Sequence, residues 1–267
     1  MKRSELVRTL YAFGLIVTIR SETAEIFSAL DRQLPPLPGA PATASADVVY
    51  RIARVRATNG FAVLRGRRTL AARVPLPVVV AVLVHDLQAV LARTAPGWTF
   101  VHAGVVSIDG RALVLPGRSG AGKSTLVEAL VRGGAHYGSD EFAILDARGL
   151  VHPYRRWLAL RTPEGVLTRV PPEDLDANLV EEGIPVDVIA FTEFRDGTAI
   201  DLRPLPPAQV ALGLLPHCPG VRQRPADTLS TLRVVAARAR GFEGVRGDAH
   251  LAARALFDQA RELRTLP

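Results

Sequence analysis

Hydrophobic and polar positions repeat along the chain with two periods, that of a strand and that of a helix. Short apolar or alternating runs bounded by glycine, proline or aspartate predict strands at 10–20, 48–55, 61–64, 69–74, 98–108, 111–116, 135–138 and 186–194, with a further apolar run at 142–145. Longer amphipathic or helix-favouring stretches predict helices at 21–34, 77–93, 123–132, 207–215, 229–238 and 248–263. Strands and helices mix throughout, which favours an α/β fold.

Proline and glycine divide this pattern into two regions. Residues 34–47 hold four prolines among alanine, serine and threonine, which predicts a linker or exposed loop, and Pro96-Gly97 marks a second break. We therefore expect an α+β region at 1–95, with tight turns at 59–60 and 65–66, and a second domain at 96–267. The strands of the first region are short and its own core is small, so we expect it to pack onto the second.

Composition adds limits on the class of protein. The chain has 267 residues, of which 48% are hydrophobic and 22% charged, as in an ordinary globular protein. Cys218 is the one cysteine, so no intrachain disulfide can form. The most apolar run, 78–84, is too short to span a bilayer, and the basic N-terminus lacks the apolar stretch of a signal peptide. We expect a cytoplasmic protein with no membrane partner.

The net charge of +7 allows a polyanionic partner, but its distribution argues against nucleic acid. Almost all of the basic charge is arginine, no basic segment is interleaved with aromatic residues, and lysine occurs only at Lys2 and Lys123. A general preference for arginine explains the charge without a nucleic-acid partner. It also makes Lys123 informative, because a compact ammonium is kept there where arginine is used nearly everywhere else.

A glycine-rich motif surrounds Lys123. Residues 117–124 match G-x-x-x-x-G-K-[ST] at every position, between a predicted strand and a predicted helix. Glycines let backbone N–H groups turn towards an anion, the lysine reaches the β- and γ-phosphates, and the serine ligates Mg²⁺. A chance glycine-rich turn is the alternative that we reject. The residues expected to bind ATP and Mg²⁺ are Gly117, Arg118, Ser119, Gly120, Ala121, Gly122, Lys123, Ser124 and Thr125.

This loop does not choose between a kinase, an ATPase motor and a GTPase. The chain has no LSGGQ-type motif, as an ATP-binding cassette protein has, and with no third lysine it cannot contain the N/T-K-x-D motif that reads guanine in GTPases. We therefore expect adenine nucleotides to bind.

Three side chains on either side of the loop carry further chemistry. His102 precedes the loop by one strand–turn–strand unit, and Asp140-Glu141 follow it by one helix and one strand. If the strands are adjacent, all three lie at the same end of the sheet as the loop. The plainer interpretations are a hydrogen-bonded histidine on a half-buried strand and a solvated pair of carboxylates at a strand end. His136, His152 and His217 lack metal-ligand spacing, so no zinc site is expected.

With these residues in place, the sequence resembles the HPr kinase/phosphorylase family, and more closely its HPr-kinase-related branch. The resemblance is carried by His102-Ala103-Gly104, by 110–117, by the loop and by Ser139-Asp140-Glu141-Phe142. Weaker similarity occurs at 13–15 with 21–22, at 74–77 and at 157–161, and it fades in the C-terminal third.

The resemblance implies a P-loop core like that of phosphoenolpyruvate carboxykinase and transfer of a phosphoryl group from ATP to a serine hydroxyl. It implies that Asp140 is the catalytic acid/base, that Lys123 and His102 act beside the phosphate site, and that Ser124 and Glu141 hold the metal. Arg161 aligns with a basic position of the related kinases and could contact a phosphate or simply face water. The acceptor is expected to be a peptide, a small protein or an amino-acid-like metabolite.

The chain also departs from the family pattern. Thr125 stands where a glutamate often follows Gly-Lys-Ser, Glu141 replaces an aspartate, and Arg155-Arg156-Trp157 stand where true HPr kinases have a glycine-rich motif. HPr as acceptor, the reverse reaction and a hexamer are therefore not carried over, and a homo-oligomer stays an open alternative. The rival function is a non-catalytic nucleotide-binding accessory or switch module of a modification or transport cluster. Asp140 discriminates between the kinase and the switch module, because a protein that only binds a nucleotide needs no carboxylate aimed at an acceptor hydroxyl.

Overall fold

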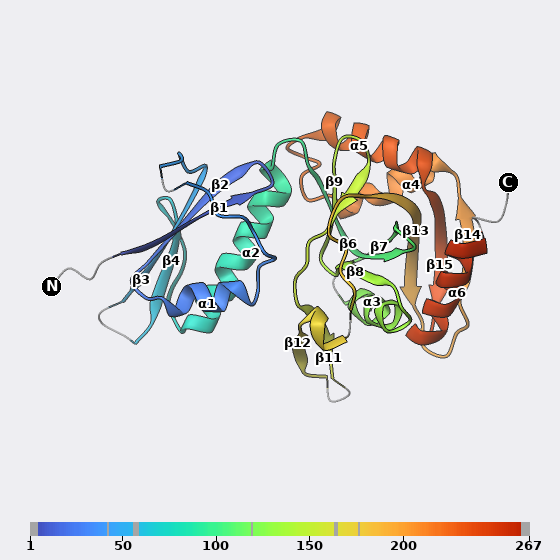
Figure 1. Ribbon diagram of the computed structural model, residues 1–267, viewed down its shortest axis with the longest axis horizontal. Helices are drawn as coiled ribbons and strands as arrows, with labels where there is room; N and C mark the ends of the chain where they lie inside the picture. Colours follow the sequence, from blue (N-terminus) through green and yellow to red (C-terminus); the bar gives the residue numbers. More distant parts are fainter. Residues whose placement is uncertain are drawn as a thin grey trace. The chain divides into compact units, whose positions relative to one another are not determined.

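The computed structural model describes residues 5–41, 43–55, 59–118, 120–162, 165–175 and 177–262, and it shows an α/β protein (Figure 1). The chain divides into two compact units, 1–96 and 97–267. Each unit has its own sheet and its own helices, so each is described by itself. The predicted packing of the first region onto the second stays a prediction.

The first unit is a five-stranded sheet with two helices. The sheet order follows the sequence, β1-β2-β3-β4-β5, with β2 and β3 parallel and the other neighbours antiparallel. The elements are β1 (Leu6–Ala12), β2 (Leu15–Ser21), α1 (Glu25–Asp31), β3 (Val48–Arg54), β4 (Phe61–Arg65), β5 (Arg68–Val74) and α2 (Leu76–Thr94). Residues 34–41 and 43–47 form no named helix or strand.

The start of this unit differs from the sequence prediction. The strand expected at 10–20 is a hairpin, because Phe13 and Gly14 both take positive φ angles, 49° and 84°, and reverse the chain. The expected helix cap at Ser21 is also wrong. α1 begins only at Glu25, and the Ser21 hydroxyl instead bonds the backbone of Thr23 in a local turn. A single glycine within an apolar run was too weak a pattern to reveal the turn.

α2 is the core helix of the first unit. Among the described residues it is the one helix with the length and apolar composition to cross a membrane. Its buried side chains, Val80, Leu83 and Leu87 among them, lie on the side that packs against α1, β4 and β5. Asp86, also on α2, accepts hydrogen bonds from the Tyr50 hydroxyl at 2.7 Å and from Arg65 at 2.9 Å. These contacts hold α2 against its own sheet.

The second unit is built on an eight-stranded mixed sheet. The strands follow the order β10-β9-β6-β7-β13-β15-β14, with β8 also paired to β6 and β10 also paired to β13. The strands are β6 (Thr99–Ile108), β7 (Arg111–Pro116), β8 (His136–Ser139), β9 (Phe142–Leu145), β10 (Leu150–His152), β13 (Ile184–Phe194), β14 (Asp201–Leu205) and β15 (Arg240–Arg246). A separate hairpin joins β11 (Leu158–Arg161) to β12 (Leu167–Val170).

Helices cover both faces of this sheet. They are α3 (Lys123–Arg132), α4 (Pro207–Leu214), α5 (Pro225–Arg238) and α6 (Ala249–Glu262), with 3₁₀ turns at Pro172–Leu175 and Leu215–His217. α3 and α6 share one hydrophobic cluster, while α4 and α5 share another (Figure 1). β7 contributes to both, since Leu113 and Leu115 face α3 and α6, whereas Ala112 and Val114 face α4 and α5. A strand buried on both faces is apolar throughout, as 112–116 is.

The connection from β6 to α3 follows the predicted pattern closely. β6 and β7 are joined by Asp109-Gly110, whose φ angles of 49° and 77° are those of a tight hairpin turn. β7 and α3 have the bounds expected from the sequence, 111–116 and 123–132. The loop between them is the glycine-rich segment. α5 begins at Pro225, four residues before the expected start, because proline is accommodated in a helix's first turn.

Candidate functional site

The glycine-rich loop folds around the Lys123 side chain. Lys123 is the first residue of α3 and only 9% exposed, and its Nζ atom donates to the carbonyl oxygens of Gly117 and Arg118, each at 2.9 Å. Among the described residues, no carboxylate lies within ion-pair distance of this ammonium. Burial lowers the pKa of Lys123, opposed by Glu141 and Asp140. Ser119 lies outside the described residues.

Arg246 supports the loop from its inner side. It ends β15, is 2% exposed, and its guanidinium donates to the carbonyl oxygens of Gly122 at 2.8 Å and Ala121 at 3.3 Å. Gly122 has a φ of 74°, and a Cβ atom at this position would lie 2.6 Å from the guanidinium. The left-handed backbone at this position favours glycine, and a side chain here would also displace the guanidinium. Arg246 therefore anchors the end of the loop, at Ala121 and Gly122, to β15.

The backbone at the end of β8 places the two carboxylates. The N-terminal half of β6 pairs with β9 and its C-terminal half pairs with β8, so Asp140 and Glu141 occupy the break between the two ladders. The Ser139 hydroxyl accepts hydrogen bonds from the N–H groups of Glu141 and Phe142, at 3.1 and 3.0 Å, which stabilises the break. The sequence prediction that the acidic pair lies beside the loop depended on this adjacency of strands.

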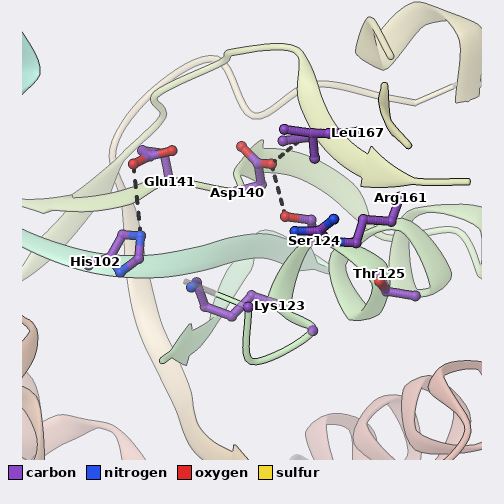
Figure 2. A pocket seen from close by; sticks show the side chains of 11 residues that line it. His102, Lys123, Ser124, Thr125, Asp140, Glu141, Arg161 and Leu167 are labelled. Atoms are coloured by element: carbon purple, nitrogen blue, oxygen red, sulfur yellow. Dashed lines mark hydrogen bonds and ion pairs between the residues drawn. The ribbon is translucent and has the colours of Figure 1, made fainter. Parts of the chain in front are cut away.

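Asp140 contacts the start of α3 directly. Its carboxylate accepts the Ser124 hydroxyl at 3.2 Å and the N–H of Ala159, in β11, at 3.0 Å (Figure 2). The residue is 6% exposed. Burial raises the pKa of Asp140 above its usual value, even though the Ala159 N–H and the Arg156 guanidinium favour the charged form. Asp140 is therefore a buried carboxylate that holds a proton more tightly than an exposed one.

Glu141 lies between a histidine and an arginine. Arg156, which is buried in the segment before β11, donates to its carboxylate at 3.1 Å. His102 Nε2 is 3.8 Å from the other carboxylate oxygen (Figure 2). Burial and the charge of Lys123 lower the pKa of His102 to about 4. The ring is neutral at pH 7, so this contact is not an ion pair.

These side chains line one pocket of about 290 Å³ (Figure 2). Of the residues expected from the sequence, it brings together His102, Gly120, Gly122, Lys123, Ser124, Thr125, Asp140 and Glu141. We call it the acidic pocket. Gly117, Arg118 and Ala121 do not line it and border a neighbouring cavity instead. The β11–β12 hairpin closes one side with Ala159, Arg161 and Leu167.

Sequence reasoning missed several residues of this site. Arg246 is one of many arginines, and nothing in its sequence neighbourhood distinguishes a buried arginine from a surface one. Arg156 is part of Arg155-Arg156-Trp157, but the sequence assigns no role to it. Ala159 acts through its backbone N–H, which no side-chain pattern reveals. Arg161 does line the pocket, and its guanidinium donates to the Gly165 carbonyl at 3.1 Å.

The donor set fits a hard divalent cation. Ser124 and Glu141 supply a hydroxyl and a carboxylate to the acidic pocket, with the Asp140 carboxylate beside Ser124. Oxygen ligands of this kind suit Mg²⁺, which takes few protein ligands and keeps several waters. Within the described part of the chain, no group of three or more His, Cys, Asp or Glu side chains gathers as a metal cluster.

Comparison with known proteins yields similarity to solved structures alone. No family model matches the sequence, and no curated protein matches it. Among solved structures, the chain is similar to the HPr(Ser) kinase/phosphatase from Coxiella burnetii, over 62% of this chain and 95% of that one, with 17% identity and a TM-score of 0.36. At this TM-score the likeness carries no weight, and the function is inferred from the geometry above.

The buried Asp140 carboxylate is expected to lower the stability of the free protein. An aspartate whose pKa is raised on folding stabilises the fold below its ordinary pKa of 3.8, and this contribution is lost as the pH rises through the folded-state pKa. Asp140→Asn keeps the shape and an oxygen for the Ala159 N–H. We expect it to raise Tm at pH 7 and to raise it less near pH 4, as measured by calorimetry.

The matched control is Asp258→Asn, which changes an exposed carboxylate on α6. It should leave Tm nearly unchanged at both pH values. A lower Tm for Asp140→Asn at pH 7, or a gain that does not depend on pH, would contradict the raised pKa.

Proposed function

We propose that this protein is an ATP- and Mg²⁺-dependent phosphotransferase that moves the γ-phosphoryl group to a hydroxyl, with serine favoured as the acceptor. The observation that carries the proposal is the position of Asp140. This buried carboxylate lies 3.2 Å from the Ser124 hydroxyl, in the pocket that also contains Lys123. A carboxylate in this place, beside the γ end of a bound triphosphate, is positioned to take the proton of an acceptor hydroxyl.

The glycine-rich loop, in this proposal, holds the triphosphate. Arg246 fixes the Ala121 and Gly122 carbonyls inward, which leaves backbone N–H groups at the start of α3 available to phosphate oxygens. Lys123, whose Nζ atom donates to the Gly117 and Arg118 carbonyls, is the cation that would meet the β- and γ-phosphates. Ser124 and Glu141 would hold Mg²⁺. When bound, the ion neutralises charge that develops on the transferred group.

Asp140 is proposed to act as the general base. It accepts the proton of the acceptor hydroxyl while that oxygen bonds to the γ-phosphorus and the bond to the β,γ-bridging oxygen breaks, so that ADP leaves. A carboxylate with a raised pKa binds this proton more readily than an exposed one. His102, neutral at pH 7, adds no cationic charge to the pocket.

The acceptor enters, in this scheme, beside the β11–β12 hairpin. Ala159, Arg161 and Leu167 border the acidic pocket, and the Ala159 N–H donates to Asp140. A peptide, a small protein or an amino-acid-like metabolite could present a hydroxyl there. The rival function, a switch module without an acceptor, predicts binding and a conformational change but no transfer.

Calorimetric titration tests the nucleotide part of the proposal. We expect Mg·ATP to bind, GTP to bind more weakly, and removal of Mg²⁺ with a chelator to weaken ATP binding. The expected adenine preference rests on the missing guanine-reading motif, since a third lysine is absent. Equal affinity for ATP and GTP would remove the adenine preference, and no heat of binding with either would remove the proposal.

A further inference from the structure

Two larger cavities lie on either side of the glycine-rich loop. One, of about 870 Å³, is lined by the loop, by Phe194 at the end of β13 with residues 196–199 after it, and by residues 246–251 from the end of β15 into α6, and we call it the α6 cavity. The other, of about 600 Å³, is bordered by the first half of the loop and by β13, β14 and β15, and we call it the β14 cavity. Both are within the range of small-ligand sites.

The α6 cavity adjoins the acidic pocket. The two share Gly120, Gly122 and Thr125, at the end of the loop and in the first turn of α3. The β14 cavity shares only Gly120 with the acidic pocket. A triphosphate whose γ end lies beside Asp140 has its α end along the loop backbone, and the space it reaches from there is the α6 cavity.

The wall of the α6 cavity suits a flat aromatic ring. Phe194 is 52% exposed although it is a large apolar side chain. The guanidinium carbon of Arg246, which also lines the cavity, lies 5.6 Å from the centre of the Phe194 ring. Nε of Arg246 is buried without a hydrogen-bond partner in the described structure. Ala199 and Leu251 add apolar surface, and Asp196 adds a carboxylate that could accept an exocyclic amino group.

We propose that the α6 cavity binds the purine nucleoside of the donor nucleotide, with the base against Phe194. The proposal rests on the proposed function, because it places the nucleoside of the same nucleotide whose γ-phosphate meets Asp140. In this arrangement the nucleotide that donates the phosphoryl group and the hydroxyl that accepts it approach from different sides of the loop. The nucleoside lies on the α6 side of the loop, and the hydroxyl approaches from the β11–β12 side.

The test compares two ligands, Mg·ATP and Mg·tripolyphosphate, in the full-length chain. Tripolyphosphate has no nucleoside, so the ratio of its Kd to that of ATP isolates the contribution of the cavity. Ala199→Trp fills the α6 cavity. Phe194→Ala removes the exposed ring, which borders both cavities, so it tests the contact with the base and not the choice of cavity. Arg203→Trp, at an exposed position of β14 that lines the other cavity, is the matched control.

We expect Ala199→Trp and Phe194→Ala each to weaken ATP about 10-fold relative to tripolyphosphate, since base–aromatic contacts commonly contribute this much. Arg203→Trp should leave the ratio unchanged. A ratio that changes in Arg203→Trp and not in Ala199→Trp would place the nucleoside in the β14 cavity and overturn the proposal, whatever Phe194→Ala does. An unchanged ratio in Ala199→Trp would overturn it in every other case too. A wild type that binds neither ligand would instead overturn the proposed function itself.

Discussion

Lys123→Ala is expected to abolish tight binding of Mg·ATP. The ammonium is enclosed by two carbonyl oxygens at 2.9 Å, with no carboxylate at ion-pair distance in the described structure. Its charge is therefore available to phosphate oxygens. A hydrogen bond to a charged group contributes about 1.5–3 kcal/mol. Losing two such bonds between the ammonium and phosphate oxygens should therefore raise the Kd for Mg·ATP by about 10²-fold or more. Calorimetric titration of the variant with Mg·ATP measures the change directly.

Lys123→Arg serves as the control for charge alone. It keeps the positive charge, but the cage formed by the Gly117 and Arg118 carbonyls has the size of a compact ammonium, and the planar guanidinium presents a different geometry. We expect it to bind Mg·ATP as poorly as the alanine variant. Binding of either variant with wild-type affinity would remove the loop from the proposed site.

Asp140→Asn is expected to slow phosphoryl transfer by about 10²- to 10⁴-fold, the range for a lost general acid–base group. The amide keeps the shape and an acceptor for the Ala159 N–H but cannot take a proton. The Kd for Mg·ATP should change little, because the loop and Lys123 are untouched. Transfer rates with saturating nucleotide, together with calorimetric affinities, separate the two effects.

Asp140→Asn is expected to change stability and activity in opposite directions. The same substitution is expected to raise Tm at pH 7 and to remove activity, because a buried ionised carboxylate costs stability and supplies the base. A variant that lost activity because its fold was damaged would instead show a lower Tm. Transfer at the wild-type rate would contradict the role of Asp140 as base.

The part of the site formed by neighbouring segments could be predicted from sequence. The Asp109-Gly110 turn fixes the β6–β7 hairpin, and the glycine-rich motif fixes the start of α3 at Lys123. Asp140 and Glu141 follow after one helix and one short strand, so their place beside the loop needed only the adjacency of β8 and β6. Local turn chemistry and short connections made these predictions possible.

The part of the site formed by distant segments could not be predicted from the sequence. β15 reads Arg-Gly-Phe-Glu-Gly-Val-Arg, whose glycines and charges do not resemble a buried strand, yet it pairs in parallel with β13 and places Arg246 under the loop. Arg156 pairs with Glu141 from an irregular segment. A buried arginine is identified by what surrounds it, and for Arg246 those surroundings come from a loop more than a hundred residues away in the sequence.

The central claim is that the acidic pocket transfers the γ-phosphoryl group of ATP to a hydroxyl. It is tested most directly by incubating the wild-type protein and Asp140→Asn with γ-³²P-labelled ATP, Mg²⁺ and pools of candidate peptides, proteins and metabolites from the host. We expect the wild type to label an acceptor with an acid-stable phosphate ester and Asp140→Asn to leave it almost unlabelled. A wild type that binds Mg·ATP and changes conformation, yet labels nothing in any pool, would contradict the claim and favour the switch module.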